Sequence, residues 1–187
     1  MKESTAVLDA CVLYPAPLRD FLMHLTLLDL FRARWTEEIH EEWIRNVLEN
    51  RPDLRREQLT RTKELMNAHT RDALIEGYEG LIETVTLPDP DDRHVLAAAI
   101  HAQADWIVTF NLCDFPARAL APHGIVAMHP DAFFLKLLEQ DAQRVHLAAE
   151  RQRTSLKNPP KTQSEYWDIM EAQGLPQTVQ KLREAAE

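Results

Sequence analysis

The stretch DPDDRHVLAAAIHAQADWIVTFNLCDF, residues 89–115, contains two secondary-structure patterns in close succession. After an acidic start, residues 93–104 are rich in alanine, which favours a helix able to pack closely against a sheet. Residues 106–110, WIVTF, are β-branched or aromatic at almost every position, as is typical of a buried strand. A helix that leads directly into a strand is part of a βαβ crossover, so this stretch predicts a parallel sheet.

The rest of the chain continues this alternation of strands and helices. Thr36 is a plausible N-cap, because Glu37 and Glu38 follow it in the acidic first turn that helices favour. Asp131 is expected to cap the long helix that follows Pro130. Strands are predicted at 5–8, 81–88, 106–110 and 124–129, and helices at 18–33, 37–48, 53–70, 93–104 and 132–150. We therefore expect an α/β fold with a parallel sheet sandwiched between helices.

A change of composition divides the chain near Arg151. Residues 1–150 carry the α/β pattern, whereas 151–187 contain the linker-like RTSLKNPPKTQSE, at 153–165, and end in two short helical patterns. This predicts a main domain and a helical C-terminal extension. Large apolar side chains in the extension predict that it docks on the main domain or on a second copy of the chain; they are Tyr166, Trp167, Ile169 and Met170.

Composition and charge exclude several classes of protein. The chain has 187 residues, of which 45% are hydrophobic, and a net charge of −9, which argues against a protein that coats nucleic acid. No apolar run approaches the roughly 20 residues needed to cross a bilayer, and the N-terminus does not resemble a secretory signal. We expect a cytoplasmic protein in which Cys11 and Cys113 are reduced, buried thiols, since they lack zinc or redox spacing.

Acidic and polar residues follow several of the predicted elements. Asp9 comes directly after the first strand, and Thr109, Asn111 and Asp114 follow the strand at 106–110. Ligands of parallel sheets bind beyond the carboxyl ends of the strands. A third group, Asp89, Asp91 and Asp92, precedes the alanine-rich helix. Clustered carboxylates repel one another unless a cation neutralises them, and hard oxygen ligands select Mg²⁺ or Mn²⁺. The alternative is structural: Asp91 or Asp92 as a helix N-cap, and Asp9 as a turn residue.

Four motifs in this order resemble the PIN domain, the metal-dependent nuclease fold of VapC-type toxins in prokaryotic toxin–antitoxin pairs. They are VLDACVL at 7–13, EIHEEW at 38–43, DPDDRHVLAAA at 89–99 and VTFNLCDF at 108–115. The resemblance extends over residues 6–134. It makes residues 1–150 a PIN-like nuclease domain and 151–187 its C-terminal linker and helical extension.

The resemblance implies a catalytic quartet of Asp9, Glu42, Asp92 and Asp114. Of these, Asp9, Asp92 and Asp114 would hold Mg²⁺ or Mn²⁺, and Asn111 would contact the substrate. The family pattern places its glutamate before a large apolar residue, which favours Glu42 over Glu41. Cys11 stands where many members have Asn or Ser and is a poorer hydrogen-bond donor than either. His94 lies one turn from Asp92 and is a further candidate for the site.

The resemblance thus implies a divalent-metal-dependent ribonuclease, the toxin of a pair, with RNA as substrate and a small antitoxin and a second copy of the chain as partners. Two rival interpretations remain. A haloacid-dehalogenase-like phosphatase would use Asp9 and Thr109, but Cys11 occupies the position of its second Asp. A PIN-like binding module would act without significant catalysis. The basic stretch at 51–63 is either a solvated helix face or a surface for phosphates.

Overall fold

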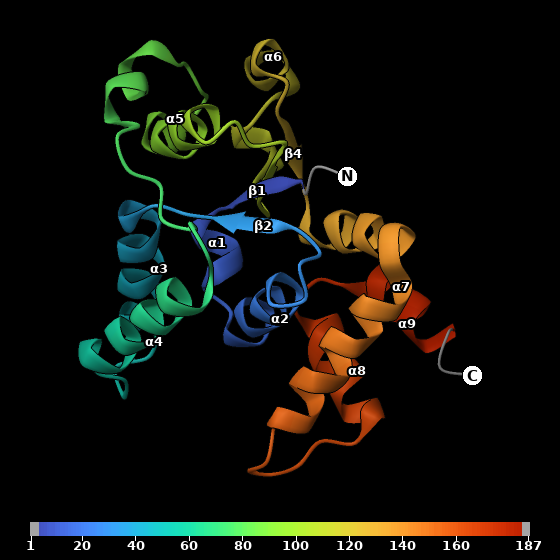
Figure 1. Ribbon diagram of the computed structural model, residues 1–187. Coiled ribbons are helices and arrows are strands. Elements are labelled where there is room, and N and C mark those ends of the chain that lie inside the picture. The colour runs from blue at the N-terminus through green and yellow to red at the C-terminus, as the bar shows by residue number, and fades with distance from the viewer. Residues whose placement is uncertain (1–3, 185–187) are drawn as a thin grey trace.

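The computed structural model describes residues 4–184 and contains a four-stranded parallel sheet (Figure 1). The strands are β1 (Thr5–Leu8), β2 (Arg32–Arg34), β3 (Trp106–Val108) and β4 (Val126–Met128), in the order β2-β1-β3-β4. In the centre, Val7 of β1 pairs with Ile107 of β3 on one side and Arg34 of β2 on the other. Strands β2 and β3 lie on opposite sides of β1, so the strand order reverses between β1 and β3. In parallel sheets a ligand site is expected at such a point, beyond the carboxyl ends of the two strands.

Helices cover both faces of this sheet. Helix α5 (Arg93–His101) contacts β1 and β3 on one face, and α1 (Ala10–Leu13), α2 (Ala16–Thr26) and α7 (Pro130–Ser155) lie on the other (Figure 1). The remaining helices are α3 (Glu37–Asn50), α4 (Arg56–His69), α6 (Ala117–Leu120), α8 (Gln163–Ala172) and α9 (Pro176–Glu184), with 3₁₀ helices η1 (Glu79–Thr84), η2 (Pro90–Asp92), η3 (Leu112–Asp114) and η4 (Ala121–His123). The predicted α/β class and helical C-terminal region are confirmed.

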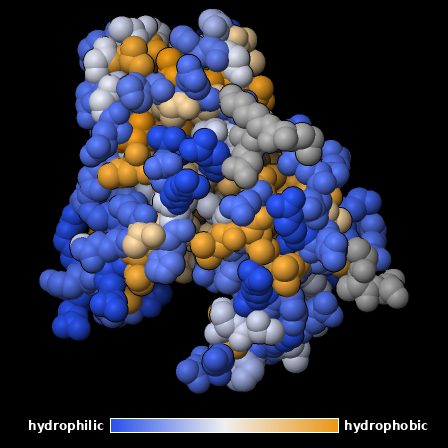
Figure 2. Space-filling view, viewed as in Figure 1, coloured by the Kyte–Doolittle hydropathy of each residue, from blue (hydrophilic) through white to orange (hydrophobic). Residues whose placement is uncertain are grey.

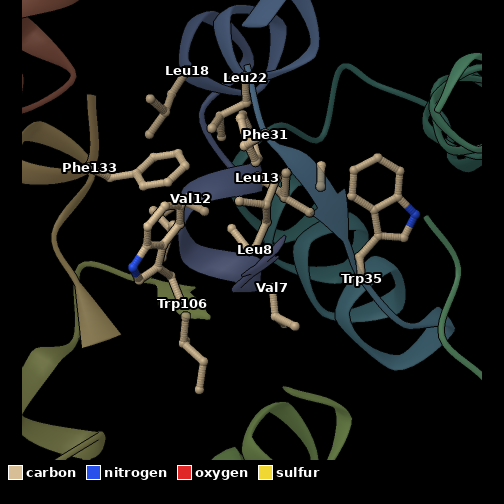
Figure 3. Close-up of a cluster of buried hydrophobic side chains, with 14 of the residues drawn as sticks. Val7, Leu8, Val12, Leu13, Leu18, Leu22, Phe31, Trp35, Trp106 and Phe133 are labelled. Atoms are coloured by element: carbon tan, nitrogen blue, oxygen red, sulfur yellow. The ribbon is translucent and has the colours of Figure 1, made fainter. Parts of the chain in front are cut away.

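Aromatic and branched side chains fill the space between the sheet and the helices below it. The ring of Phe133 meets Phe31 at 4.9 Å and Trp106 at 5.5 Å between ring centroids, in edge-to-face contacts. Leu8, Val12, Leu13, Leu18 and Leu22 surround this aromatic group (Figure 3). Each fully buried side chain of this size contributes about 1.5–3 kcal/mol, so the core holds β1 and α1 in place.

The predicted helix at 18–33 is wrong in its second half. Helix α2 ends at Thr26, Asp29 turns the chain with a φ of +53°, and Arg32–Arg34 form β2. Phe31 and Ala33 are buried in the sheet. Their apolar character satisfies the helical period as well as the alternation of a strand, which explains the misassignment.

The predicted strand at 81–88 is also wrong. Residues Glu79–Thr84 form η1, which packs against α5. Val85 and Leu87 are buried without pairing to a strand of the sheet. Alternating apolar residues here reflect burial of one side of an extended segment rather than a strand.

The start of α7 differs from the prediction as well. His129, not Asp131, is its N-cap, and the His129 ring accepts a hydrogen bond from the backbone N–H of Asp131 at 3.2 Å. The buried Asp131 carboxylate instead accepts hydrogen bonds from the Thr178 N–H at 2.8 Å and the Thr178 hydroxyl at 2.6 Å. Asp131 therefore caps α9 of the C-terminal extension, and α7 continues past position 150 to Ser155.

The C-terminal extension docks on the main domain, as its apolar residues predicted. Tyr166, Trp167 and Met170 of α8 are buried, and Ile169 is half-buried. The Tyr166 hydroxyl donates to Gln152 of α7 at 2.7 Å, and the Gln152 amide donates to the carbonyl of Pro17 in α2 at 2.8 Å. Within residues 4–184, none of the helices is long and apolar enough to span a membrane.

Candidate active site at the carboxyl ends of the strands

Asp9 is the centre of a hydrogen-bonded group at the end of β1. Its carboxylate accepts from the backbone N–H of Ala10 at 2.7 Å, which makes Asp9 the N-cap of α1. Its other oxygen, Oδ2, accepts from the Thr109 hydroxyl at 2.7 Å, directly after β3. Burial raises the pKa of Asp9; these hydrogen bonds lower it, while the charge of Glu42 raises it further, so the net shift is upward. The sequence prediction that Asp9 and Thr109 meet at one edge of the sheet agrees with this geometry.

Cys11 takes part in the same group, which corrects the expectation of a spectator thiol. Its sulfur lies 3.2 Å from Asp9 Oδ2 and 3.4 Å from the Thr109 hydroxyl, and it accepts from the Phe110 N–H at 3.3 Å. Burial and the charge of Asp9 raise the pKa of Cys11 to about 12, so the thiol keeps its proton and donates to the carboxylate. Cys113 is exposed rather than buried, and the structure describes both cysteines as free.

The two adjacent glutamates of α3 have different surroundings. Glu41 forms ion pairs with Arg56 and Lys63 of α4, the latter with a nitrogen–oxygen distance of 3.9 Å. Glu42 instead faces α5, where its Oε1 lies 3.1 Å from Nε2 of His94. Only Glu42 therefore belongs to the acidic group, and two cations of the basic stretch are neutralised by α3.

His94 is a site residue that sequence reasoning treated only as a secondary candidate. Its side chain is 3% exposed, and it lies between Glu42 and Glu38. Burial lowers the pKa of His94, but the hydrogen bond to Glu42 and the charges of Glu42, Glu38 and Asp9 outweigh it, so the pKa lies above its ordinary value. The signal was its position two residues after Asp92, at the start of the same helix.

Asp92 and Asp114 complete the acidic group. Burial, followed by the negative charges of Asp9, Asp114, Asp89 and Glu42, raises the pKa of Asp92 to about 7. Asp92 makes no capping hydrogen bond with its side chain. Asp89 fills the capping role instead, accepting from the Asp91 N–H at 2.9 Å. The capping role considered for Asp91 or Asp92 is therefore taken by Asp89, which caps η2, and the carboxylate of Asp92 makes no capping hydrogen bond.

Asn111 and Asp114 lie on the loop that follows β3. Asn111 is exposed, and its N–H donates to the Thr109 hydroxyl at 3.0 Å. The N–H of Asp114 donates to the carbonyl of Asn111 at 3.0 Å, which closes the turn of η3. These bonds place both residues beside the Asp9–Thr109 pair.

The donor set suits a hard divalent cation in its chemistry. Besides burial, the charges of Asp9, Asp114 and Glu42 raise the pKa of Asp92, and the charge of Glu42 raises the pKa of Asp9. A cation would relieve this repulsion. Within residues 4–184, however, no three Asp, Glu, His or Cys side chains stand close enough together to enclose an ion. The carboxylates thus interact through their charges, and Asp92 and Asp114 must turn toward Asp9 to share a ligand with it.

Comparison with known proteins agrees with the fold. The PIN domain family model matches residues 5–112, and this match covers more than half of the chain. The chain therefore belongs to the PIN-domain family. A second family model, the VapC50 C-terminal domain, matches residues 130–184, which include α7, α8 and α9.

A curated relative shares the VapC50 name with the second family model. The chain is 37% identical over 107 residues to the protein named "Putative ribonuclease VapC50" of Mycobacterium tuberculosis (strain ATCC 25618 / H37Rv). The match covers 57% of this chain and 62% of that relative, just over three fifths of its length. No solved structure is significantly similar to the chain.

Proposed function

We propose that this PIN-domain protein is a divalent-metal-dependent ribonuclease and the toxin of a toxin–antitoxin pair. The observation that carries the proposal is the acidic group at the carboxyl ends of β1 and β3. Asp92 there has a pKa of about 7 because burial and three neighbouring carboxylates in the quartet oppose its ionisation. A carboxylate cluster that contains a strongly raised pKa is typical of a catalytic or metal site.

Asp9, Asp92 and Asp114 are the residues proposed to hold Mg²⁺ or Mn²⁺, with Glu42 beside them. A bound cation would supply charge neutralisation at the phosphate and a more acidic water as nucleophile. Thr109 and Cys11 orient Asp9 by donating hydrogen bonds to Oδ2. Ala10 fixes the other oxygen through its backbone N–H. These three contacts hold Asp9 in one orientation while Asp92, free of capping bonds, can turn toward the ion.

RNA is the proposed substrate because the relative's name describes a ribonuclease. The net charge of −9 predicts weak non-specific binding, so selection by RNA shape or by a short loop sequence is expected. The exposed Asn111, next to Thr109 on the site loop, is the proposed contact to the substrate.

A small antitoxin is the proposed protein partner. Two pockets, of about 650 and 330 Å³, share Ala16 and Asp20 and together form a groove across α2, between α4 and α8. Figure 2 shows the surface hollowed between these two parts of the molecule. Leu27 and Leu65, both 49% exposed, border this groove and offer apolar contacts. A homodimer stays a prediction that sedimentation of the purified chain tests.

RNA cleavage in the presence of Mn²⁺, with and without EDTA, tests the catalytic proposal. We expect cleavage with Mn²⁺ or Mg²⁺ and none with EDTA. An aryl phosphate assay in the same buffers separates the rival phosphatase interpretation, which predicts release of phosphate and intact RNA. Binding of RNA without cleavage under every metal condition would favour the binding module instead. Growth arrest on expression, relieved by a copurifying small protein, tests the toxin proposal.

A further inference from the structure

The contact between His94 and Glu42 joins two helices at the edge of the acidic group. His94 is the second residue of α5, and its side chain is 3% exposed. Its Nε2 lies 3.1 Å from Oε1 of Glu42, which sits in the middle of α3 and is 25% exposed. A carboxylate ion only accepts hydrogen bonds, so Nε2 carries the hydrogen and donates it.

The other ring nitrogen of His94 has no hydrogen-bond partner among the described residues, although it is buried. The nearest acidic atom is Oε2 of Glu38, at 3.6 Å, beyond hydrogen-bond distance. Glu38 is itself occupied by the hydroxyl of Tyr78, which donates to it at 3.2 Å. Unpaired buried polar atoms are disfavoured, so an apolar side chain would fill this space at a lower cost than a histidine. The ring is thus committed to one bond, the one to Glu42.

We infer that His94 is a positioning residue, which holds the Glu42 carboxylate at the acidic site through its Nε2–H. The inference rests on the proposed function, since it assigns a role within that same site. A glutamate side chain has three rotatable bonds and loses much freedom when one oxygen is fixed. With Oε1 fixed by His94, the site does not have to order Glu42 again at each turnover.

Residues that orient a metal-site ligand typically change activity or metal affinity by about 10–100-fold when they are replaced. We expect a loss in this range in kcat for RNA cleavage when the donor at Nε2 is removed. KM for RNA should change little, because His94 is buried and does not contact the solvent from which RNA binds.

A pair of amide substitutions provides the test. In His94→Gln the side-chain NH₂ reaches the position of Nε2, whereas in His94→Asn it reaches only that of Nδ1. Both variants bury a neutral amide, so their thermal stabilities should be similar. The inference predicts that His94→Gln retains most of kcat and that His94→Asn loses about 10–100-fold. His101→Gln, at the exposed end of the same helix, is the matched control and should cleave like the wild type.

A double-mutant cycle with Glu42→Gln separates positioning from a general structural effect. If His94 acts through Glu42, adding His94→Asn to Glu42→Gln should cause no further loss of kcat. Additive losses, or equal activity of His94→Gln and His94→Asn, would overturn the inference. Absence of cleavage by the wild-type chain in Mn²⁺ would instead contradict the proposed function itself, so the two failures are distinguishable.

Discussion

The hydroxyl of Thr109 donates a hydrogen bond to Oδ2 of Asp9 at 2.7 Å, across 100 residues of sequence. This bond joins the carboxyl ends of β3 and β1, the two central strands of the sheet. Both residues are buried. Because Asp9 also caps α1 with its other oxygen, its carboxylate has no freedom to rotate without breaking contacts on both sides. The orientation of the first acidic residue is therefore set by the fold and not by a ligand.

Removal of the Thr109 hydroxyl should weaken metal binding at the site and leave β3 in place. Thr109→Val keeps the volume but removes one of the three donors to Asp9, leaving the Cys11 thiol and the Ala10 N–H. The loss costs about 1–3 kcal/mol of unfolding free energy. We expect a lower Tm and weaker Mn²⁺ binding by calorimetry. Thr109→Ser, which restores the donor, should recover both. Unchanged Mn²⁺ affinity in Thr109→Val would mean that Asp9 needs no support from β3.

Asp92→Asn should stabilise the metal-free protein while it abolishes cleavage. The pKa of Asp92 is about 7 in the folded chain, against an ordinary value of 3.8, because of burial and the charges of Asp9 and Asp114. Folding therefore favours the protonated form, and ionisation destabilises the fold progressively as the pH rises from about 4 to about 7. At pH 8 in EDTA we expect a gain on the order of 1–2 kcal/mol after allowance for solvent screening.

The gain from Asp92→Asn should vanish below pH 4, where the carboxyl is protonated in both states. Asp91→Asn is the matched control, since Asp91 is exposed and adjacent, and its Tm should be nearly unchanged. A lower Tm for Asp92→Asn at pH 8 would show that Asp92 is structural.

The buried His40 should make the fold less stable as the pH falls, which is the reverse of the effect of Asp92. Its Nδ1 accepts from the indole N–H of Trp43 at 2.9 Å, and its Nε2 lies 3.2 Å from Oδ1 of Asn67, so the ring is held neutral. Burial, opposed by the Asn67 hydrogen bond, lowers the pKa of His40 to about 4. The stabilisation is complete above pH 6.5 and is lost as the pH falls toward 4.

Thermal unfolding of wild type and His40→Gln at pH 7 and pH 4 checks this. The wild type should lose on the order of 3 kcal/mol more than the variant over this range. Comparing the two proteins cancels the opposing effect of Asp92, which both retain. Parallel pH profiles would contradict a neutral, buried His40.

The docked C-terminal extension should contribute strongly to stability. Trp167 is 6% exposed, and replacing a buried aromatic residue with alanine costs about 3–5 kcal/mol. Trp167→Ala should therefore lower the Tm, and proteases should cleave the wild type only slowly after Lys161. Rapid release of a folded core by trypsin, with the Tm of the intact chain, would show that α8 and α9 are dispensable.

The sequence predicted the parts of the fold that depend on local signals. Thr36 caps α3, with its hydroxyl accepting from Ile39 N–H at 3.0 Å, and the strands containing Ala6 and Ile107 lie where their apolar runs indicate. Strand β2 was missed because its pairing with β1 is non-local, and Phe31 fits a helix period as well as a strand. The cap of α9 by Asp131 was missed because the partner, Thr178, is 47 residues away.

In the candidate site, too, features with a local signal could be predicted and contacts between distant residues could not. The positions of Asp9 and Asp114 beyond β1 and β3 could be predicted because each follows a recognisable strand, and that of Asp92 because it precedes the alanine-rich helix. The bond between His94 and Glu42 could not, since it depends on how α5 packs against α3. The participation of Cys11 was underestimated because a thiol is a weak donor in isolation. In the structure the half-buried thiol lies between Asp9, Thr109 and Phe110, where it both donates and accepts hydrogen bonds.

The measurement that tests the central claim most directly is the chemistry of the cut RNA end. A water nucleophile at a carboxylate-bound cation leaves no 2′,3′-cyclic phosphate, unlike attack by the neighbouring 2′-hydroxyl. We therefore predict that the wild type, in Mn²⁺, yields fragments without cyclic phosphate. Asp114→Asn should yield no fragments, and Glu41→Gln should cleave like the wild type. Fragments ending in cyclic phosphate, or cleavage by Asp114→Asn at the wild-type rate in Mn²⁺, would contradict the account.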